Sequence, residues 1–276
     1  MKNSTDEREI KYCYVTVLTT QSYLEGCRIL YKSLQATMPK YPFVVVCPDN
    51  IPKNVTDCLT QLGISYHLAE NLNADILSRE NQNQYWNHTL FKIKVFDLTQ
   101  YDKIVFLDTD MIVLSNLDHL FDLEHMSAVD AGAVIHPEWK GGINSGLMII
   151  KPDHHVYEGL VSCIEPAYRQ RKEDNLGFGD QDIIKTYYKD WRHCEHLHLS
   201  ECYNTMLGYG GCLKKAGVIR SWQDIKVYHY TGKEKPWNSD FKSHMIILFK
   251  IIKRAGIRSN IDFRIYRKYR KLLQQS

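Results

Sequence analysis

The sequence predicts an α/β protein in which one mixed sheet is flanked by helices. Short apolar runs rich in branched residues recur along the chain, and 104–107 is the clearest of them. Segments with helical spacing of apolar residues alternate with these runs, beginning at 23–34. The 276 residues, 44% hydrophobic and 24% charged, are typical of a soluble globular protein with room for one large domain or two small ones.

The N-terminal half begins with a strand, a polar turn and a helix. After a polar leader at 1–10, a strand is expected at 12–18, and the polar residues 19–22 separate it from the helix at 23–34. Such a turn places hydroxyl and helix-terminal N–H groups where a base or phosphate can bind. Further elements are expected as strands at 43–47 and 64–67 and a helix at 54–63.

The middle of the chain contains a long stretch without periodicity. Residues 70–88 are polar and rich in Asn and Gln, which is typical of a functional loop. Helical spacing returns at 90–98, and this segment carries Lys92 and Lys94 toward the next strand.

Two carboxylates, Asp108 and Asp110, end the strand expected at 104–107. Ligands of open α/β sheets bind beyond the carboxyl ends of the strands. Two carboxylates are costly to bring together in a low-dielectric site unless positive charge lies between them. A hard divalent cation meets that need and commonly shares its remaining positions with phosphate oxygens. Alone, the D-x-D pattern fits a strand and a polar turn equally well.

The second half of the chain returns repeatedly to the sheet. Strands are expected at 128–135, 147–150, 196–199 and 226–230, and a helix at 153–172. Two turns between them are polar. The first, at 141–146, is rich in glycine, and the second, at 177–182, opens a helix at Ile183.

The loop after the last expected strand supplies partners for the two carboxylates. His229 offers an imidazole nitrogen, Gly232 permits close backbone approach, and Lys235 can reach a phosphate. Together with Asp108 and Asp110, these residues suit a metal ion bound to a diphosphate. The mixed oxygen and nitrogen ligands favour Mn²⁺, with Mg²⁺ as the alternative ion.

The pairing of FLDTDMIVLSNLDHLF with HYTGKEKPW resembles the retaining glycosyltransferases of family 8, over most of residues 12–240. The resemblance implies the GT-A fold that glycogenin shares with bacterial lipooligosaccharide galactosyltransferases, here over 11–240. It also implies Mn²⁺-dependent transfer of glucose or galactose from a UDP-sugar to an acceptor hydroxyl, with retention. The acceptor is left open among a glycan, a lipid-linked sugar, a polyol and a protein.

The resemblance also implies the site residues. Asp108, Asp110 and His229 would hold the metal, while Asn144, Asp180 and Gln181 would act at the reacting face of the donor sugar. The other residues implied to bind the UDP-sugar are Thr19, Thr20, Tyr23, Lys92, Thr109, Ser145, Gly232 and Lys235. Arg79 is a candidate for the family's loop arginine, and Tyr209 lies near the region of glycogenin's acceptor tyrosine without matching its motif.

Three alternatives remain. The chain could bind nucleotide sugars or glycans without turnover, or FLDTDMIV could begin a phosphatase of the haloacid-dehalogenase type. A zinc site could also form from a group with metal-like composition, although alternation on one strand face accounts for part of it. That group is His193, Cys194, His196, His198 and Cys202.

Cysteine usage and charge distribution bear on location and partners. Eight cysteines without a C-x-x-C pair and a polar N-terminus indicate a reducing, cytoplasmic compartment. Residues 241–276 hold ten Lys or Arg and one acid, which leaves 25 basic and 31 acidic residues elsewhere. This basic amphipathic tail is expected either to form a solvated helix or to bind an anionic membrane surface through Phe241, Ile246, Phe249, Ile265 and Tyr266. Nucleic acid is not expected, because the acidic body would repel it.

Overall fold

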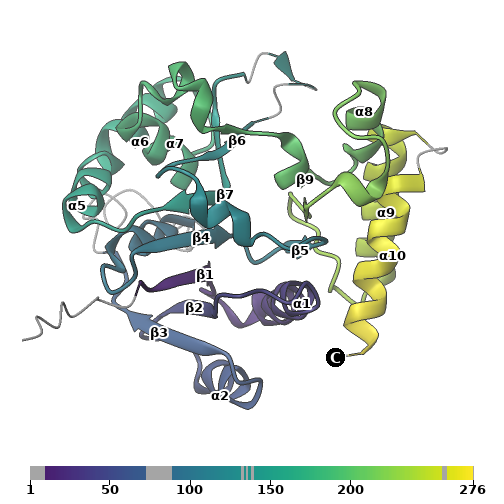
Figure 1. Ribbon diagram of the computed structural model, residues 1–276, viewed down its shortest axis with the longest axis horizontal. Coiled ribbons are helices and arrows are strands. Elements are labelled where there is room, and N and C mark those ends of the chain that lie inside the picture. The colour runs from purple at the N-terminus through teal and green to yellow at the C-terminus, as the bar shows by residue number, and fades with distance from the viewer. Residues whose placement is uncertain are drawn as a thin grey trace, which may run out of the picture.

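The computed structural model describes residues 10–72, 89–131, 134, 136–137, 140–256 and 260–275. Most of the leader, most of the polar loop expected at 70–88, and Arg79 lie outside these residues. Two sheets carry helices on both sides, and the C-terminal helices stand together at one side (Figure 1). The predicted α/β class is confirmed.

A seven-stranded mixed sheet forms the centre of the fold, in the order β3-β2-β1-β4-β7-β6-β8. The first four strands pair in parallel, while β7 runs antiparallel to both β4 and β6. The strands are β1 Tyr12–Val17, β2 Phe43–Pro48, β3 Ser65–Ala69, β4 Lys103–Leu107, β6 Ala128–Asp130, β7 Ile143–Ile150 and β8 His198–Leu199.

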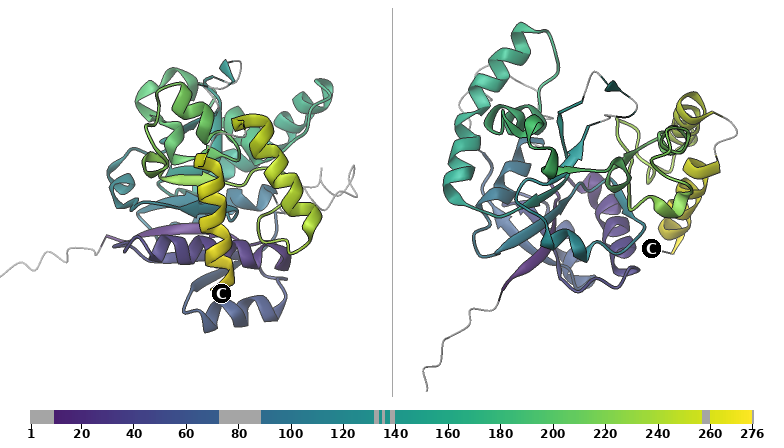
Figure 2. Two further views of the ribbon diagram at one scale, coloured as in Figure 1. Left: turned by 90° about the vertical axis from the view of Figure 1, so that its right-hand side faces the viewer. Right: turned by 45° about the horizontal axis from the view of Figure 1, so that its top comes forward.

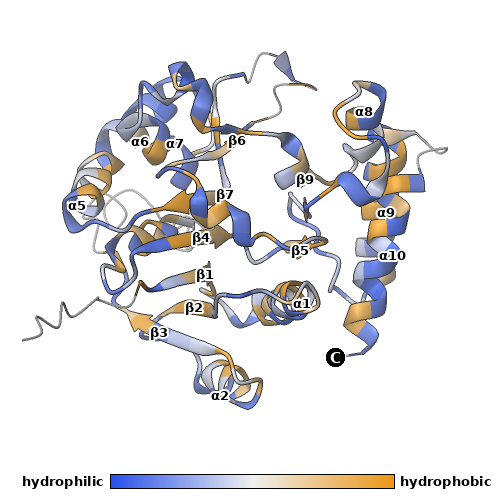
Figure 3. Cartoon of the chain, viewed as in Figure 1, coloured by the Kyte–Doolittle hydropathy of each residue, from blue (hydrophilic) through white to orange (hydrophobic). Residues whose placement is uncertain are grey.

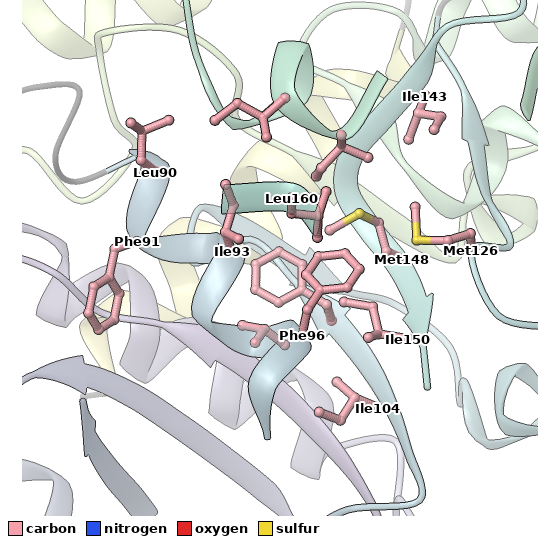
Figure 4. Packing of buried hydrophobic residues seen from close by; sticks show 14 of the residues in the cluster. Leu90, Phe91, Ile93, Phe96, Ile104, Met126, Ile143, Met148, Ile150 and Leu160 are labelled. Atoms are coloured by element: carbon pink, nitrogen blue, oxygen red, sulfur yellow. The ribbon is translucent and has the colours of Figure 1, made fainter. Parts of the chain in front are cut away.

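Both faces of the central strands are buried, which explains their continuous apolar runs. In β4, Ile104 and Phe106 join one core cluster, and Val105 and Leu107 join the cluster on the opposite face. Figure 4 shows the first cluster between the sheet and the helices above it, and Figure 3 shows the hydrophobic colouring of the central strands.

Helices from different parts of the chain cover the two faces. Residues of α5, α6 and α7 pack in the first cluster, and those of α1 and α2 pack in the second. The helix bounds are α1 Leu24–Gln35, α2 Lys53–Gln61, α5 His154–Ser162, α6 Ile164–Glu173, α7 Asp180–Tyr187, α8 Gly210–Lys215, α9 Phe241–Ala255 and α10 Asn260–Gln274.

A second, three-stranded sheet joins the middle of the chain to its last third. It contains β5 Met111–Val113, β10 Val227–His229 and β9 Thr205–Met206, in that order. Strand β10 runs antiparallel to β5 and pairs His229 with Met111. Since Met111 directly follows Asp110, this pairing brings the loop after β10 to the D-x-D turn.

Several predicted boundaries were wrong. The strand expected at 128–135 ends at Asp130, whose carboxylate accepts a hydrogen bond from Gly141 N at 2.7 Å, and part of 131–135 lies outside the described residues. The helix expected at 153–172 divides at Cys163, because Pro166 has no N–H to continue the hydrogen bonding of α5. Residues 91–97 form a 3₁₀ helix (η2, Phe91–Asp97) that packs against α5.

Two other boundaries affect the polar turns. Asn144 and Ser145 lie within β7 rather than in a glycine-rich turn, because Ile143 already pairs with Asp130 of β6. Helix α7 begins at Asp180 rather than at Ile183. The Asp182 carboxylate accepts a hydrogen bond from Gly179 N at 2.9 Å, which sets this earlier start.

The basic tail folds as two helices that pack on the small sheet. Helix α10 buries Ile265, Tyr266 and Tyr269 against this sheet and α1, and α9 buries Ile247 and Ile251. Figure 2 shows α9 and α10 side by side on this face. Neither a fully solvated helix nor a free membrane-binding tail describes the segment, since its apolar residues divide between the core and the surface. No helix of the described chain is long and apolar enough to cross a bilayer.

Candidate active site

The two acids of the D-x-D motif meet the imidazole of His229 at the junction of the two sheets. His229 Nε2 lies 3.0 Å from Asp110 Oδ1 and 3.9 Å from Asp108 Oδ2. One ligand atom from each of the three residues lies within 4.8 Å of the others. Tyr230 N donates to Asp110 O at 2.9 Å, which holds the β10 loop against the D-x-D turn. The predicted convergence of distant segments is therefore confirmed.

The surroundings of these three side chains suit a divalent cation. Two carboxylates and one imidazole supply hard oxygen and borderline nitrogen ligands around one point. A side chain at Gly146 would place its Cβ 2.8 Å from Met111 Cε and 3.0 Å from His229 Cε1, so a larger residue behind the imidazole would require these side chains to shift. No other group of three His, Cys, Asp or Glu ligands is found in the described residues, where His198 stacks on Trp191 instead.

A buried lysine links the first acid to a third carboxylate. Lys92 Nζ lies 2.9 Å from Asp108 Oδ1 and 2.8 Å from Asp180 Oδ2, and its side chain is 8% exposed. Ser145 Oγ also donates to Asp180 Oδ2, at 2.6 Å. Burial alone would lower the pKa of Lys92, but Asp108 and Asp180 outweigh it and raise the pKa above its usual range. The ammonium therefore stays charged.

A second lysine balances the other acid. Lys235 Nζ donates to Asp110 Oδ2 at 2.5 Å and to Tyr230 O at 3.1 Å. Burial opposes ionisation of Asp110, yet the nearby His229 and Lys235 hold its pKa well below the usual range. The same carboxylate raises the pKa of Lys235 against the effect of burial. Asp110 is thus held as a carboxylate, with the His229 imidazole beside Oδ1 and the Lys235 ammonium beside Oδ2.

A cavity of about 290 Å³ opens beside these groups. The three residues expected to act on the donor sugar, Asn144, Asp180 and Gln181, all line it. Lys92, Asp108, Ser145 and His229 line it as well, and so do Ala131, Met206 and Thr231, which were not predicted. Strand β7 supplies Asn144, and the first turn of α7 supplies Asp180 and Gln181.

The predicted base-binding turn lies against the loop that carries Lys235. Trp237 Nε1 donates to Ser22 O at 2.9 Å, and the Trp237 ring lies 5.3 Å from that of Tyr23. Lys235 Nζ lies 5.6 Å from the centre of the Tyr23 ring. Thr20 Oγ1 shares a hydrogen bond with Ser22 Oγ at 2.8 Å, so its hydroxyl is near this contact. Thr19 precedes Thr20 and is partly exposed.

Two further residues implied to bind the UDP-sugar, Thr109 and Gly232, have contacts of their own within the fold. Thr109 Oγ1 donates to Val17 O at 2.6 Å, so this hydroxyl ties the D-x-D turn to β1 instead of facing the cavity. Gly232 has φ of 105°, and a Cβ there would lie 3.0 Å from Lys250 Nζ. Its backbone conformation therefore favours glycine.

Asn204 is a buried residue of the site that sequence reasoning missed. Its Oδ1 accepts a hydrogen bond from His229 Nδ1 at 2.9 Å, and its Nδ2 donates to Asn144 Oδ1 at 2.8 Å. It precedes β9, a two-residue strand that is too short to leave a periodic signal. Only the pairing of β9 with β10 brings it to the metal ligands.

Comparison with known proteins decides which family this arrangement represents. A family model described as Glycosyl transferase family 8 matches residues 14–240. The chain belongs to glycosyltransferase family 8. This membership removes the phosphatase alternative, since the D-x-D motif lies within the family match.

Curated relatives of this family 8 glycosyltransferase include human glycogenin-1, which is 27% identical over 237 residues, covering 82% of this chain and 62% of glycogenin-1. The chain thus spans less than two thirds of that protein's length. The uncharacterized protein R707 of Acanthamoeba polyphaga mimivirus is 30% identical over 250 residues, covering 82% of this chain and 83% of R707.

Solved structures confirm the GT-A fold of this family 8 member. The galactosyltransferase LgtC, in complex with donor and acceptor sugar analogues, matches 93% of this chain and 99% of LgtC with a TM-score of 0.58 at 16% identity. An active-site mutant of LgtC matches 90% of this chain and 98% of its own length with a TM-score of 0.59, also at 16% identity. At such identity the likeness shows the fold alone.

Proposed function

We propose that this family 8 member is a retaining hexosyltransferase that moves glucose or galactose from a UDP-sugar to an acceptor hydroxyl with Mn²⁺, or Mg²⁺ in its place. The observation that carries the proposal is the meeting of two residue groups around one cavity. Asp108, Asp110 and His229 suit a cation and its diphosphate, while Asn144, Asp180 and Gln181 line adjacent space of sugar size.

The diphosphate side of the proposed site is built from charged groups already in contact. Asp108, Asp110 and His229 would hold the ion, which when bound would serve as a Lewis acid for the leaving diphosphate. Lys235 would add its positive charge to the same oxygens. The base would lie toward Thr19, Thr20 and Tyr23, where Trp237 joins the turn to the loop.

The sugar side supplies anionic and amide groups. Asp180 is held between Lys92 and Ser145, so its carboxylate is fixed at the edge of the cavity. Such a carboxylate stabilises positive charge that develops on the anomeric carbon. Gln181 and Asn144 would hydrogen-bond the sugar and the entering hydroxyl. Two mechanisms would give retention with these groups. In one, the acceptor attacks from the face that the diphosphate leaves, and in the other, a double displacement runs through Asp180.

Self-glycosylation at Tyr209 is not part of the proposal. Its hydroxyl is hydrogen-bonded to His136 Nε2 at 2.7 Å, and the residue is 8% exposed. The Arg254 guanidinium also covers the Tyr209 ring, at 4.8 Å from its centre. A separate glycan, lipid-linked sugar, polyol or protein is the proposed acceptor.

A thermal-shift panel of nucleotide sugars with and without Mn²⁺ tests the donor class. We expect UDP-glucose or UDP-galactose at 100 times its Kd to raise Tm by about 5 °C, only with the metal present. GDP-mannose is the mismatched control. Equal stabilisation by every nucleotide sugar, or none by any UDP-sugar, would contradict the proposal.

Release of UDP and free hexose separates an enzyme from a silent binding protein. A transferase hydrolyses its donor slowly when no acceptor is present, whereas a sensor or lectin-like module returns it unchanged. Mn²⁺-dependent UDP release from the stabilising donor therefore supports transfer, and stabilisation without any release supports the binding alternative.

We also propose that one face of α9 contacts an anionic membrane at the cytoplasmic side. Four apolar side chains line this face at helical spacing and are exposed, with exposures of 77%, 47%, 64% and 40% for Phe241, Met245, Phe249 and Ile252. Lys242 and Lys253 lie exposed on the same helix. Ile265 and Tyr266 belong to the core, so they have no part in this revised surface.

Vesicle sedimentation tests this face of α9 without removing the core. Replacing the four exposed residues by Ser is expected to lower binding to phosphatidylserine vesicles at least about fivefold, because their burial in lipid is lost. The control variant replaces Met38 and Leu68, which are exposed elsewhere. Equal sedimentation of wild type and the α9 variant would contradict the proposal. Truncation at residue 240 is unsuitable, since it removes buried residues.

A further inference from the structure

A chain of hydrogen bonds runs from a backbone amide of β7 to the imidazole of His229. Gly146 N donates to Asn144 Oδ1 at 3.0 Å. Asn204 Nδ2 donates to the same oxygen at 2.8 Å, and Asn204 Oδ1 faces His229 Nδ1 at 2.9 Å. Asn204 is 3% exposed, so water does not substitute for these partners.

The direction of every bond in this chain follows from its first member. A backbone N–H can only donate, so the atom of Asn144 that faces Gly146 must be the amide oxygen. The atom of Asn204 that faces this oxygen must then be its NH₂ group, which leaves its own oxygen toward His229. An amide oxygen only accepts, so Nδ1 of His229 carries a proton.

The proton on Nδ1 fixes which nitrogen of His229 faces the two acids of the metal site. With its proton on Nδ1, His229 directs Nε2 at Asp110 and Asp108, at 3.0 Å and 3.9 Å. Ligating imidazoles are oriented and made more basic by such a partner on the other ring nitrogen. Asn144 Oδ1 has both acceptor positions filled by Gly146 and Asn204, so its NH₂ group is left to donate toward the cavity that Asn144 lines.

We propose that Asn204 is a positioning residue that holds the Nδ1–H of His229 for metal binding and, through its NH₂ group, orients the Asn144 amide toward the donor sugar. This inference rests on the proposed function, whose metal and sugar groups it connects. Gly146 lies close against the Asn204 amide, since a Cβ on this glycine would lie 2.9 Å from Asn204 Nδ2. One side chain thereby serves both halves of the site.

Two substitutions separate the two bonds of Asn204. Asn204→Ala removes both, whereas Asn204→Asp keeps an acceptor for His229 Nδ1–H and loses the donor to Asn144. We expect Asn204→Ala to weaken Mn²⁺ binding about 10- to 100-fold, measured with the metal alone by electron paramagnetic resonance. Asn204→Asp should retain Mn²⁺ affinity within about threefold but lower kcat for the UDP-sugar about tenfold or more.

A readout in the metal-free full chain tests the inference independently of function. In ¹⁵N-labelled protein, the Nδ1–H proton of His229 should give a protected, slowly exchanging signal that Asn204→Ala removes and Asn204→Asp retains. Asn116→Ala is the control, since Asn116 also bonds backbone and side chain groups, but near Met38 and Asp118. Thermal unfolding of each variant establishes that it is folded.

The outcomes distinguish this inference from the proposed function. If the wild type binds neither Mn²⁺ nor a UDP-sugar, the proposed function fails while the protected Nδ1–H can still be observed. If the wild type binds both and Asn204→Ala binds Mn²⁺ equally well with an unchanged His229 signal, the inference about Asn204 is overturned alone. If both variants lose Mn²⁺ equally, the separation of its two roles is overturned.

Discussion

Asp110→Asn is expected to lower kcat/KM for the UDP-sugar by at least about 100-fold. Asp110 is the acid that both His229 and Lys235 contact, at 3.0 Å and 2.5 Å. The amide keeps the shape of the side chain but removes the negative charge, and its NH₂ group must face either the imidazole or the ammonium. One substitution therefore weakens binding of the proposed cation and removes the carboxylate that positions Lys235.

Steady-state kinetics over a range of Mn²⁺ concentrations measures this effect. Asp174→Asn is the matched control, because Asp174 is an exposed acid at the end of α6 and should retain full activity. A loss of less than about tenfold for Asp110→Asn, at saturating metal, would argue against the proposed metal site. Thermal unfolding of both variants separates a catalytic loss from a loss of folded protein.

Asp262→Ala is expected to destabilise the protein by at least about 3 kcal/mol, because two buried donors and one partly buried donor lose their acceptor. Asp262 is fully buried on α10 and accepts from Gly210 N at 3.0 Å, Gly211 N at 3.1 Å and Tyr228 OH at 2.8 Å. It thus joins the C-terminal helices to α8 and to β10. Tyr228 is adjacent to His229, so the damage also reaches the strand that carries the metal ligand.

Urea unfolding monitored by circular dichroism measures the change in stability. Asp57→Ala on the exposed side of α2 is the control and should shift stability by less than about 0.5 kcal/mol. Asp262→Asn should fall between the two, because one amide oxygen can still accept while the NH₂ group opposes another donor. A loss below about 1 kcal/mol for Asp262→Ala would contradict a structural role for the C-terminal helices.

The site was predictable where its residues lie in long, regular runs. The strand 104–107 is continuous and apolar, so its end and the acids Asp108 and Asp110 could be located from the sequence. The loop of His229 and Lys235 could be paired with them because a metal needs further ligands and a diphosphate needs a cation. The structure brings these residues together as predicted.

The parts of the site and of the C-terminal segment that were not predicted depend on contacts that leave no periodic signal in the sequence. Asn204 reaches His229 only through the two-residue strand β9, and the hydrogen bond from the Thr109 hydroxyl to Val17 O joins residues far apart in the sequence. The C-terminal segment was misjudged because its charge and its apolar residues fit a membrane-binding helix as well as a packed one. Only the partner surface of the small sheet shows which of its apolar residues are buried and which stay exposed.

The hydrogen bond from Lys235 to Asp110 affects how a cation and a diphosphate would bind at this site. An ammonium that neutralises this carboxylate through Oδ2 weakens its attraction for an incoming cation beside Oδ1. Once displaced, Lys235 carries an unbalanced charge that a diphosphate can satisfy. Under the proposed function, metal and nucleotide would then be linked thermodynamically: each would tighten the other by the same factor, so neither affinity would be a constant of the protein alone.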